Sequence, residues 1–152
     1  MNDGRAPMAD GDHTPRILVD DRQDRAVDLD GLVALAAECL VGEGAPNAEL
    51  SVSFVSEDEI ADLHARYLGE GGPTDVLSFT LDETDEDGVR MVGDVVIAPS
   101  VAARNNEADP AAEMRLLLVH GILHLLGHDH EEDEERAAMW AIQEHYTGMR
   151  VP

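Results

Sequence analysis

The 152-residue sequence contains no lysine, a single cysteine and only 3% aromatic residues. One cysteine cannot form an internal disulfide, and without a cysteine cluster there is no thiolate metal site. We expect Cys39, in an apolar helical stretch, to be a small buried side chain. No apolar run approaches the roughly 18 residues of a membrane span, and the N-terminus lacks the apolar core of a signal peptide. These absences predict a cytoplasmic protein that has no membrane partner.

Positive charge is also scarce. Ten arginines stand against 33 aspartates and glutamates, so the net charge is −23 with histidine neutral. Proteins that bind nucleic acid or anionic membranes by electrostatic attraction present basic surfaces instead. The composition therefore argues against DNA as a partner. An RNA ligand would require either the gathering of Arg66, Arg90, Arg104 and Arg115 near the site or a partner that presents the RNA.

Hydrophobic periodicity predicts an α+β fold, with a small mixed β-sheet packed against several helices. Residues 1–15 are polar and aperiodic and are expected to form a disordered lead-in, and residues 16–152 a single domain. Strands are predicted at 17–19, 50–55, 76–81 and 92–98, and helices near 30–40, 56–68, 99–105, 110–126 and 131–146. The fourth helix begins at Asp109 as N-cap with Pro110 at the first position. Its apolar residues cover much of its circumference, so we expect it to be central and mostly buried.

That central helix carries a histidine pair, His120 and His124, four residues apart and so on one face. Gly127 can adopt the left-handed conformation that reverses the chain after a helix. Such a turn would bring His130 back toward the pair. Three neutral imidazoles leave the fourth position of a tetrahedral zinc ion open to water, as in catalytic sites. The sequence therefore predicts one zinc ion held by His120, His124 and His130.

Other interpretations of these histidines must be weighed. The pair alone could be buried and hydrogen-bonded without a metal, but a third histidine so close would then need its own partner. The spacing also matches the metzincin peptidase helix, in which the residue after the first histidine is a glutamate base. Here that residue is Gly121, which disfavours a peptidase of this type. Asp129 is the candidate to orient a ligand or accept a proton, and His128 is expected to flank the site.

Three segments together resemble the YbeY family, zinc-dependent endoribonucleases of bacterial ribosomal RNA maturation. They are H-G-x-L-H-L-x-G-x-D-H at 120–130, P-T-D-V-L-S-F at 73–79 and G-D-V-V-I at 93–97. The resemblance implies a cleft over the metal and cleavage of single-stranded RNA. It also implies processing of the 16S rRNA precursor at its 3′ end on the small ribosomal subunit, and a part in ribosome quality control.

Carried over by position, the resemblance implies that Thr74, Asp75 and Ser78 line or support the cleft, while Phe79 is expected to pack in the core. Many relatives have an arginine where this chain has Leu68. Arg66, two residues earlier, is the candidate substitute for a catalytic role, although residues two apart do not share a helical face. Two further functions stay open: a zinc hydrolase of another substrate, such as peptides, and a non-catalytic zinc-stabilised ribosome assembly factor.

Overall fold

A four-stranded mixed sheet forms the centre of the protein, in a computed structural model that describes residues 14–68, 74–128 and 132–148. Its strands, in the order β1-β2-β4-β3, are β1 (Arg16–Asp21), β2 (Ala48–Phe54), β4 (Arg90–Ile97) and β3 (Val76–Thr84). β2 runs parallel to both of its neighbours, whereas β3 and β4 form an antiparallel hairpin. Apart from Thr14 and Pro15, the expected lead-in lies outside the described residues.

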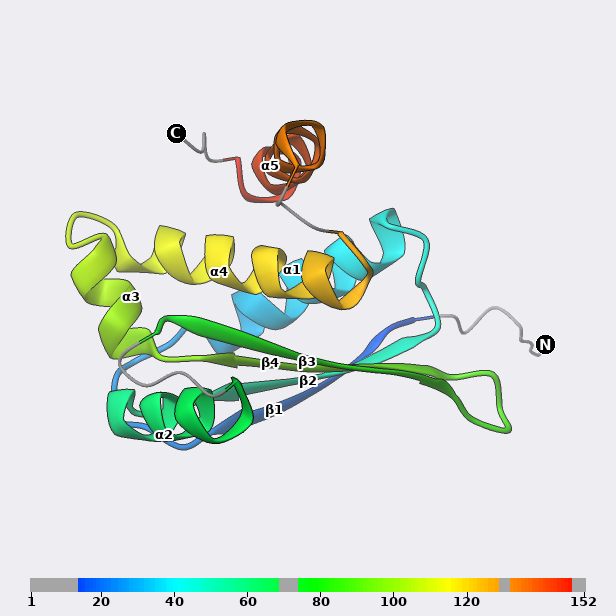
Figure 1. Cartoon of the computed structure of the whole chain (residues 1–152). Helices are drawn as coiled ribbons and strands as arrows, with labels where there is room; N and C mark the ends of the chain where they lie inside the picture. Colours follow the sequence, from blue (N-terminus) through cyan, green and yellow to red (C-terminus); the bar gives the residue numbers. More distant parts are fainter. Residues whose placement is uncertain (1–13, 69–73, 129–131, 149–152) are drawn as a thin grey trace.

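Helices cover both faces of this sheet (Figure 1). The helices are α1 (Leu29–Gly42), α2 (Glu57–Leu68), α3 (Pro99–Asn105), α4 (Pro110–Leu125) and α5 (Asp133–Thr147). α1 and α4 lie on one face and α2 on the other, while α5 packs on the outer side of α4. This arrangement confirms the predicted α+β class. In the described part of the chain, no helix has both the length and the apolar character needed to cross a bilayer.

Each face of the sheet has its own hydrophobic core. The larger core lies between the sheet and helices α1 and α4, and Phe54, Leu118 and Ile122 are fully buried in it. Burial of an apolar side chain of this size contributes about 1.5–3 kcal/mol. The smaller core joins the sheet to α2, and Phe79 packs against it, as expected from the sequence. Cys39 is 0% exposed, which confirms its predicted burial.

The central helix α4 begins and ends as predicted. The Asp109 carboxylate accepts a hydrogen bond from the Ala112 amide at 3.1 Å, and Pro110 occupies the first turn. Nine of the sixteen residues of α4 are buried, so the helix lies between the sheet and α5 rather than at the surface. After the helix, Gly127 adopts a φ of 98°, in the left-handed region. The chain therefore turns at this glycine.

The β3–β4 hairpin differs from the sequence prediction. We predicted a charged turn over residues 82–88, but β3 continues to Thr84. The pairing register shifts between Thr80 and Glu83, and Asp82 has a φ of 53°. A bulge of this kind inserts unpaired residues without ending the strand. The hairpin is consequently longer, and its turn shorter, than the acidic composition indicates.

Candidate functional site

The two histidines of α4 face each other one helical turn apart. His120 and His124 have their Nε2 atoms 3.1 Å apart and their ring centroids 4.6 Å apart. Both rings are half-buried. The shared face predicted from the four-residue spacing is therefore confirmed.

Gln143, on α5, holds one of these rings in place. Its Oε1 lies 2.7 Å from His120 Nδ1, and the glutamine side chain is buried, with 2% of the residue exposed. An amide oxygen can only accept, so His120 Nδ1 must carry the hydrogen. In a neutral ring, the Nε2 lone pair of His120 is then directed toward His124. The Nε2–H of His124 donates into it.

Gln143 was not among the residues singled out from the sequence. The signal that could have found it is its place on α5: Met139, Gln143 and Tyr146 recur at helical spacing, and all three are buried or half-buried. A polar residue on the buried stripe of a helix needs a partner, because an unpaired polar group is costly there. The partner is 23 residues away in sequence.

Gly121, between the histidines along the chain, faces the sheet. A Cβ at this position would lie 2.8 Å from Val95 Cγ1 and 3.2 Å from Ser78 Oγ. Ser78 Oγ also donates a hydrogen bond to the Gly121 carbonyl at 3.2 Å. The position thus has no room for a glutamate, which explains in steric terms why the peptidase base is missing from this motif.

A cavity of about 310 Å³ opens in front of the histidine pair. Its walls come from β3 and α4, and its lining residues are Val76, Leu77, Ser78, Thr80, His120 and His124. Ser78 thus lines this cavity, and its expected contact with a substrate stays a prediction. Thr80 was not singled out from the sequence, although it follows Ser78 with the two-residue period of a strand.

The other two residues of the Thr-Asp segment lie at the start of β3. Asp75 accepts a hydrogen bond from Asn105 Nδ2 at 3.1 Å, and its carbonyl accepts one from the Ala98 amide. Burial, together with the charge of Asp75, raises the pKa of the Glu113 carboxyl. Asp75 therefore ties β3 to α3 in this structure. The expected substrate contacts of Thr74 and Asp75 stay predictions.

Arg66 lies on α2, which covers the opposite face of the sheet from α4. Its Nη2 pairs with Asp62 Oδ2 at 2.7 Å, and its side chain is 61% exposed. An exposed pair at this spacing contributes about 0.3–0.5 kcal/mol. The predicted catalytic role of Arg66 stays a prediction, and the described residues supply no contact between it and the cavity.

His130 and Asp129 lie outside the described residues. Within residues 14–68, 74–128 and 132–148, no group of three or more histidine, cysteine or acidic side chains is placed to hold a metal ion. His128 has its Nε2 3.6 Å from Glu43 Oε1, near the end of α1. The third ligand and the role of Asp129 therefore stay predictions.

The donor atoms that are described fit a zinc ion. Zinc–imidazole bonds of 2.0–2.1 Å at a tetrahedral angle place two ligand nitrogens about 3.3 Å apart. The Nε2 atoms of His120 and His124 are 3.1 Å apart. The Nδ1–H of His120 is held by an outer acceptor, as is usual for metal-bound histidines. To bind the ion, the two rings would need small adjustments, and His124 would need to move its hydrogen from Nε2 to Nδ1 so that the Nε2 lone pair is available.

Positive charge does not collect at this cavity. Arg90 pairs with Asp82 at 3.0 Å, and Arg104 binds both carboxylate oxygens of Glu57 at 2.6 and 3.0 Å. The bond from Arg104 lowers the pKa of Glu57. Arg115 lines a different pocket, at the start of α4. The four arginines considered in the sequence analysis are therefore not gathered near the histidines.

This fold and site define a small α+β protein that is a candidate metalloprotein. Its central helix carries a histidine pair, one ring of which is held by a hydrogen bond to Gln143. The chain belongs to the YbeY family: the family described as Endoribonuclease YbeY matches residues 19–149. This match confirms the resemblance seen in the sequence.

Several relatives named Endoribonuclease YbeY are similar to this chain. The one from Frankia alni is 50% identical over 110 residues, covering 64% of this chain and 61% of the relative. The one from Salinispora tropica is 42% identical over 132 residues, covering 77% and 84%. The match to the relative from Frankia casuarinae covers 55% of that protein, so the chain spans little more than half the length of some relatives. The solution structure of TM1509 from Thermotoga maritima is 32% identical, with a TM-score of 0.59, and covers 88% of this chain and 86% of that one.

Proposed function

We propose that this protein is a zinc-dependent endoribonuclease that cleaves single-stranded RNA in the cytoplasm. Its substrate would be the 16S rRNA precursor, matured at the 3′ end on the small ribosomal subunit, and the same activity would serve ribosome quality control. Family membership supports the activity. The observation that carries the proposal is the His120–His124 pair, with Nε2 atoms 3.1 Å apart in front of a cavity of about 310 Å³.

In this proposal His120, His124 and His130 hold the ion. When bound, zinc lowers the pKa of a coordinated water toward about 7 and polarises a phosphoryl oxygen. Gln143 keeps His120 in the tautomer whose Nε2 can bind the ion. The hydroxyl groups of Ser78 and Thr80 lie on the cavity wall, where they can donate to phosphate or ribose oxygens. Asp129 is the candidate to orient a ligand histidine or accept a proton.

The charge distribution favours RNA that is presented by the ribosome. A protein that binds free RNA uses lysine and arginine contacts to phosphates. Here the cavity is lined by aliphatic, hydroxyl and imidazole side chains, and the overall charge is −23. A ribosomal particle can position its own RNA strand against the cavity without a basic surface on this chain. Free RNA is accordingly expected to be a poor substrate.

Metal analysis followed by cleavage of precursor small-subunit particles tests this function. Wild type should carry one zinc per chain and shorten the 16S precursor. His124→Ala should lose both the metal and the cleavage. His145→Ala, an exposed histidine on α5, is the matched control and should keep both. Circular dichroism should show that each variant remains folded.

Three outcomes would contradict the proposal in different ways. A zinc-free wild type would remove the metal site. Zinc-loaded protein that cleaves peptides, with loss of activity in His124→Ala, would point to another hydrolase. Zinc-loaded protein that binds particles without cleaving them, and unfolds as His124→Ala, would point to a structural assembly factor. Rapid cleavage of naked RNA at low salt would contradict only the charge argument.

A further inference from the structure

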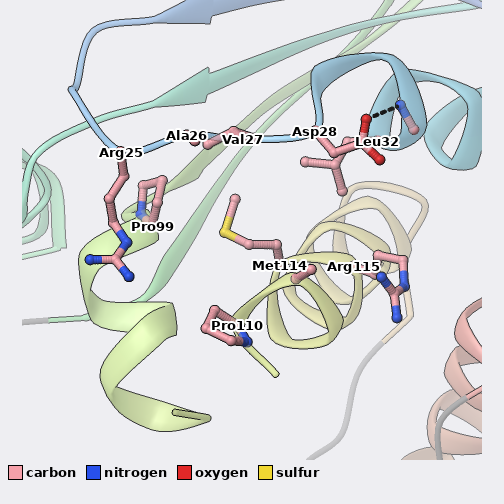
Figure 2. A pocket seen from close by; sticks show the side chains of 11 residues that line it. Arg25, Ala26, Val27, Asp28, Leu32, Pro99, Pro110, Met114 and Arg115 are labelled. Carbon is pink, nitrogen blue, oxygen red and sulfur yellow. Dashed lines mark hydrogen bonds between the residues drawn. The ribbon is translucent and has the colours of Figure 1, made fainter. Parts of the chain in front are cut away.

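A second pocket, of about 330 Å³, lies where helices α1, α3 and α4 begin (Figure 2). Arg25 follows the carboxyl end of strand β1, and Pro99 follows that of the parallel strand β4. Crevices beyond the carboxyl ends of parallel strands are common ligand sites in α/β sheets. The pocket shares no lining residue with the histidine cavity. It is therefore a separate candidate site.

Two arginines at this pocket differ from the others in the described part of the chain. Six of the eight described arginines pair with a carboxylate within 4 Å: Arg16, Arg22, Arg66, Arg90, Arg104 and Arg136. Within the same residues, the Arg25 and Arg115 side chains make neither an ion pair nor a hydrogen bond. In a chain with 33 acidic residues, two uncompensated guanidinium groups at one pocket favour an anionic ligand from outside.

The space between these two arginines is apolar. Figure 2 shows Arg25 and Arg115 at opposite ends of the pocket, with the Met114 side chain between them. Leu32 and Met114 are buried, with exposed fractions of 6% and 7%. Asp28 also lines the pocket, but its Oδ1 accepts the Gly31 amide at 3.1 Å and so caps α1. A ligand would thus meet an apolar floor with a cation at each end and the capping carboxylate of Asp28 on one side.

We propose that this pocket binds an extended segment of a partner protein, in which an apolar side chain is flanked by two carboxylates. The volume is at the low end of ligand pockets and suits one or two apolar side chains. Methionine adapts well to such side chains, and each guanidinium can bind a carboxylate through two parallel hydrogen bonds. An RNA strand fits less well, because none of the lining residues is aromatic and a base would have no stacking surface.

The test is NMR titration of the ¹⁵N-labelled full chain with short peptides. The probes are acetyl-Glu-Leu-Glu-amide and its longer forms with one or two alanines inserted on each side of leucine, which scan the spacing of the carboxylates. At least one of them should shift the amide signals of residues 25–32 and 111–115 and leave those of 120–124 in place. The same peptides with glutamine in place of glutamate should bind at least about tenfold more weakly.

Arginine variants complete the test. Arg25→Gln and Arg115→Gln should each weaken binding about tenfold, and Arg115→Lys should retain part of it if the glutamine variant fails to fold. Arg66→Gln, an exposed arginine outside the pocket, should bind as wild type. The proposal is overturned if no peptide shifts these signals at millimolar concentration, if the glutamine peptides bind equally well, or if oligouridylate binds the pocket instead. None of these results depends on zinc or on nuclease activity.

Discussion

Replacing Gln143 with methionine removes the amide oxygen that accepts a hydrogen bond from His120 and nearly preserves the shape of the side chain. Only 2% of Gln143 is exposed, so bulk water cannot replace the lost acceptor. A buried donor left without a partner costs about 1–3 kcal/mol. In metal-free protein we expect the free energy of unfolding to fall by that amount. Urea denaturation followed by circular dichroism measures it.

The same substitution should weaken zinc binding. Outer partners of metal-bound histidines contribute about 10–100-fold to metal affinity, because they orient the ring and fix its tautomer. That loss corresponds to about 1.4–2.7 kcal/mol. Competition with a chromophoric chelator gives the affinity directly. Gln143→Glu keeps an acceptor at the same place and should bind zinc at least as tightly as wild type.

A matched control comes from Gln23, the other glutamine of the chain, whose side chain donates to Asp21 at the end of β1 and to the Arg25 carbonyl. Gln23→Met should leave zinc affinity unchanged. If Gln143→Met matches wild type in both stability and zinc affinity, the hydrogen bond to His120 does not order the site, and the reasoning from tautomer to metal binding is wrong.

Three further changes test the packing around the site. Gly121→Ala should destabilise the protein by up to about 2 kcal/mol in urea melts, because overpacking against buried Val95 costs about 1–3 kcal/mol and alanine gains only about 1 kcal/mol in a helix. A more stable variant would refute the close contact. Tyr146→Phe should cost about 1 kcal/mol by removing the 2.7 Å bond to Glu43, and an unchanged melting temperature would count against it. Burial raises the pKa of Cys39 from 9.0 to about 12. The folded state thus favours the neutral thiol, and stability should decline as the pH rises above 9. At pH 8, iodoacetamide should modify Cys39 only in denaturant, as mass spectrometry would show.

Much of the fold was accessible from local sequence patterns. The alternation in β2, the apolar circumference of α4 and its Asp109-Pro110 start are set by residues close in sequence, and the structure confirms them. The bulge in β3 was not predictable, because it depends on how Thr80 to Glu83 pair with β4. The acidic composition of that segment carries no information about register. The strand order likewise depends on which helices pack together.

In the candidate site, too, the local features were predicted and the contacts between distant segments were not. His120 and His124 were predicted as a facing pair because four-residue spacing fixes their relation within one helix. Gln143 and the Ser78–Gly121 contact were missed, since they join α4 to elements that are distant along the chain. Arg25 was missed, and Arg115 was considered only for an RNA site near the histidines, for the same reason: only the folded chain shows which arginines have a carboxylate within reach.

Because His120 depends on the hydrogen bond to Gln143, the site can be completed only after residue 143 has been synthesised. A growing polypeptide contains both α4 histidines well before the residue that orients one of them has been added. Until α5 has folded onto α4, the His120 imidazole lacks its acceptor and can take either tautomer. We therefore expect a nascent chain that stops short of residue 143 to bind metal weakly. The order of translation itself would then delay the proposed nuclease activity until α5 is in place.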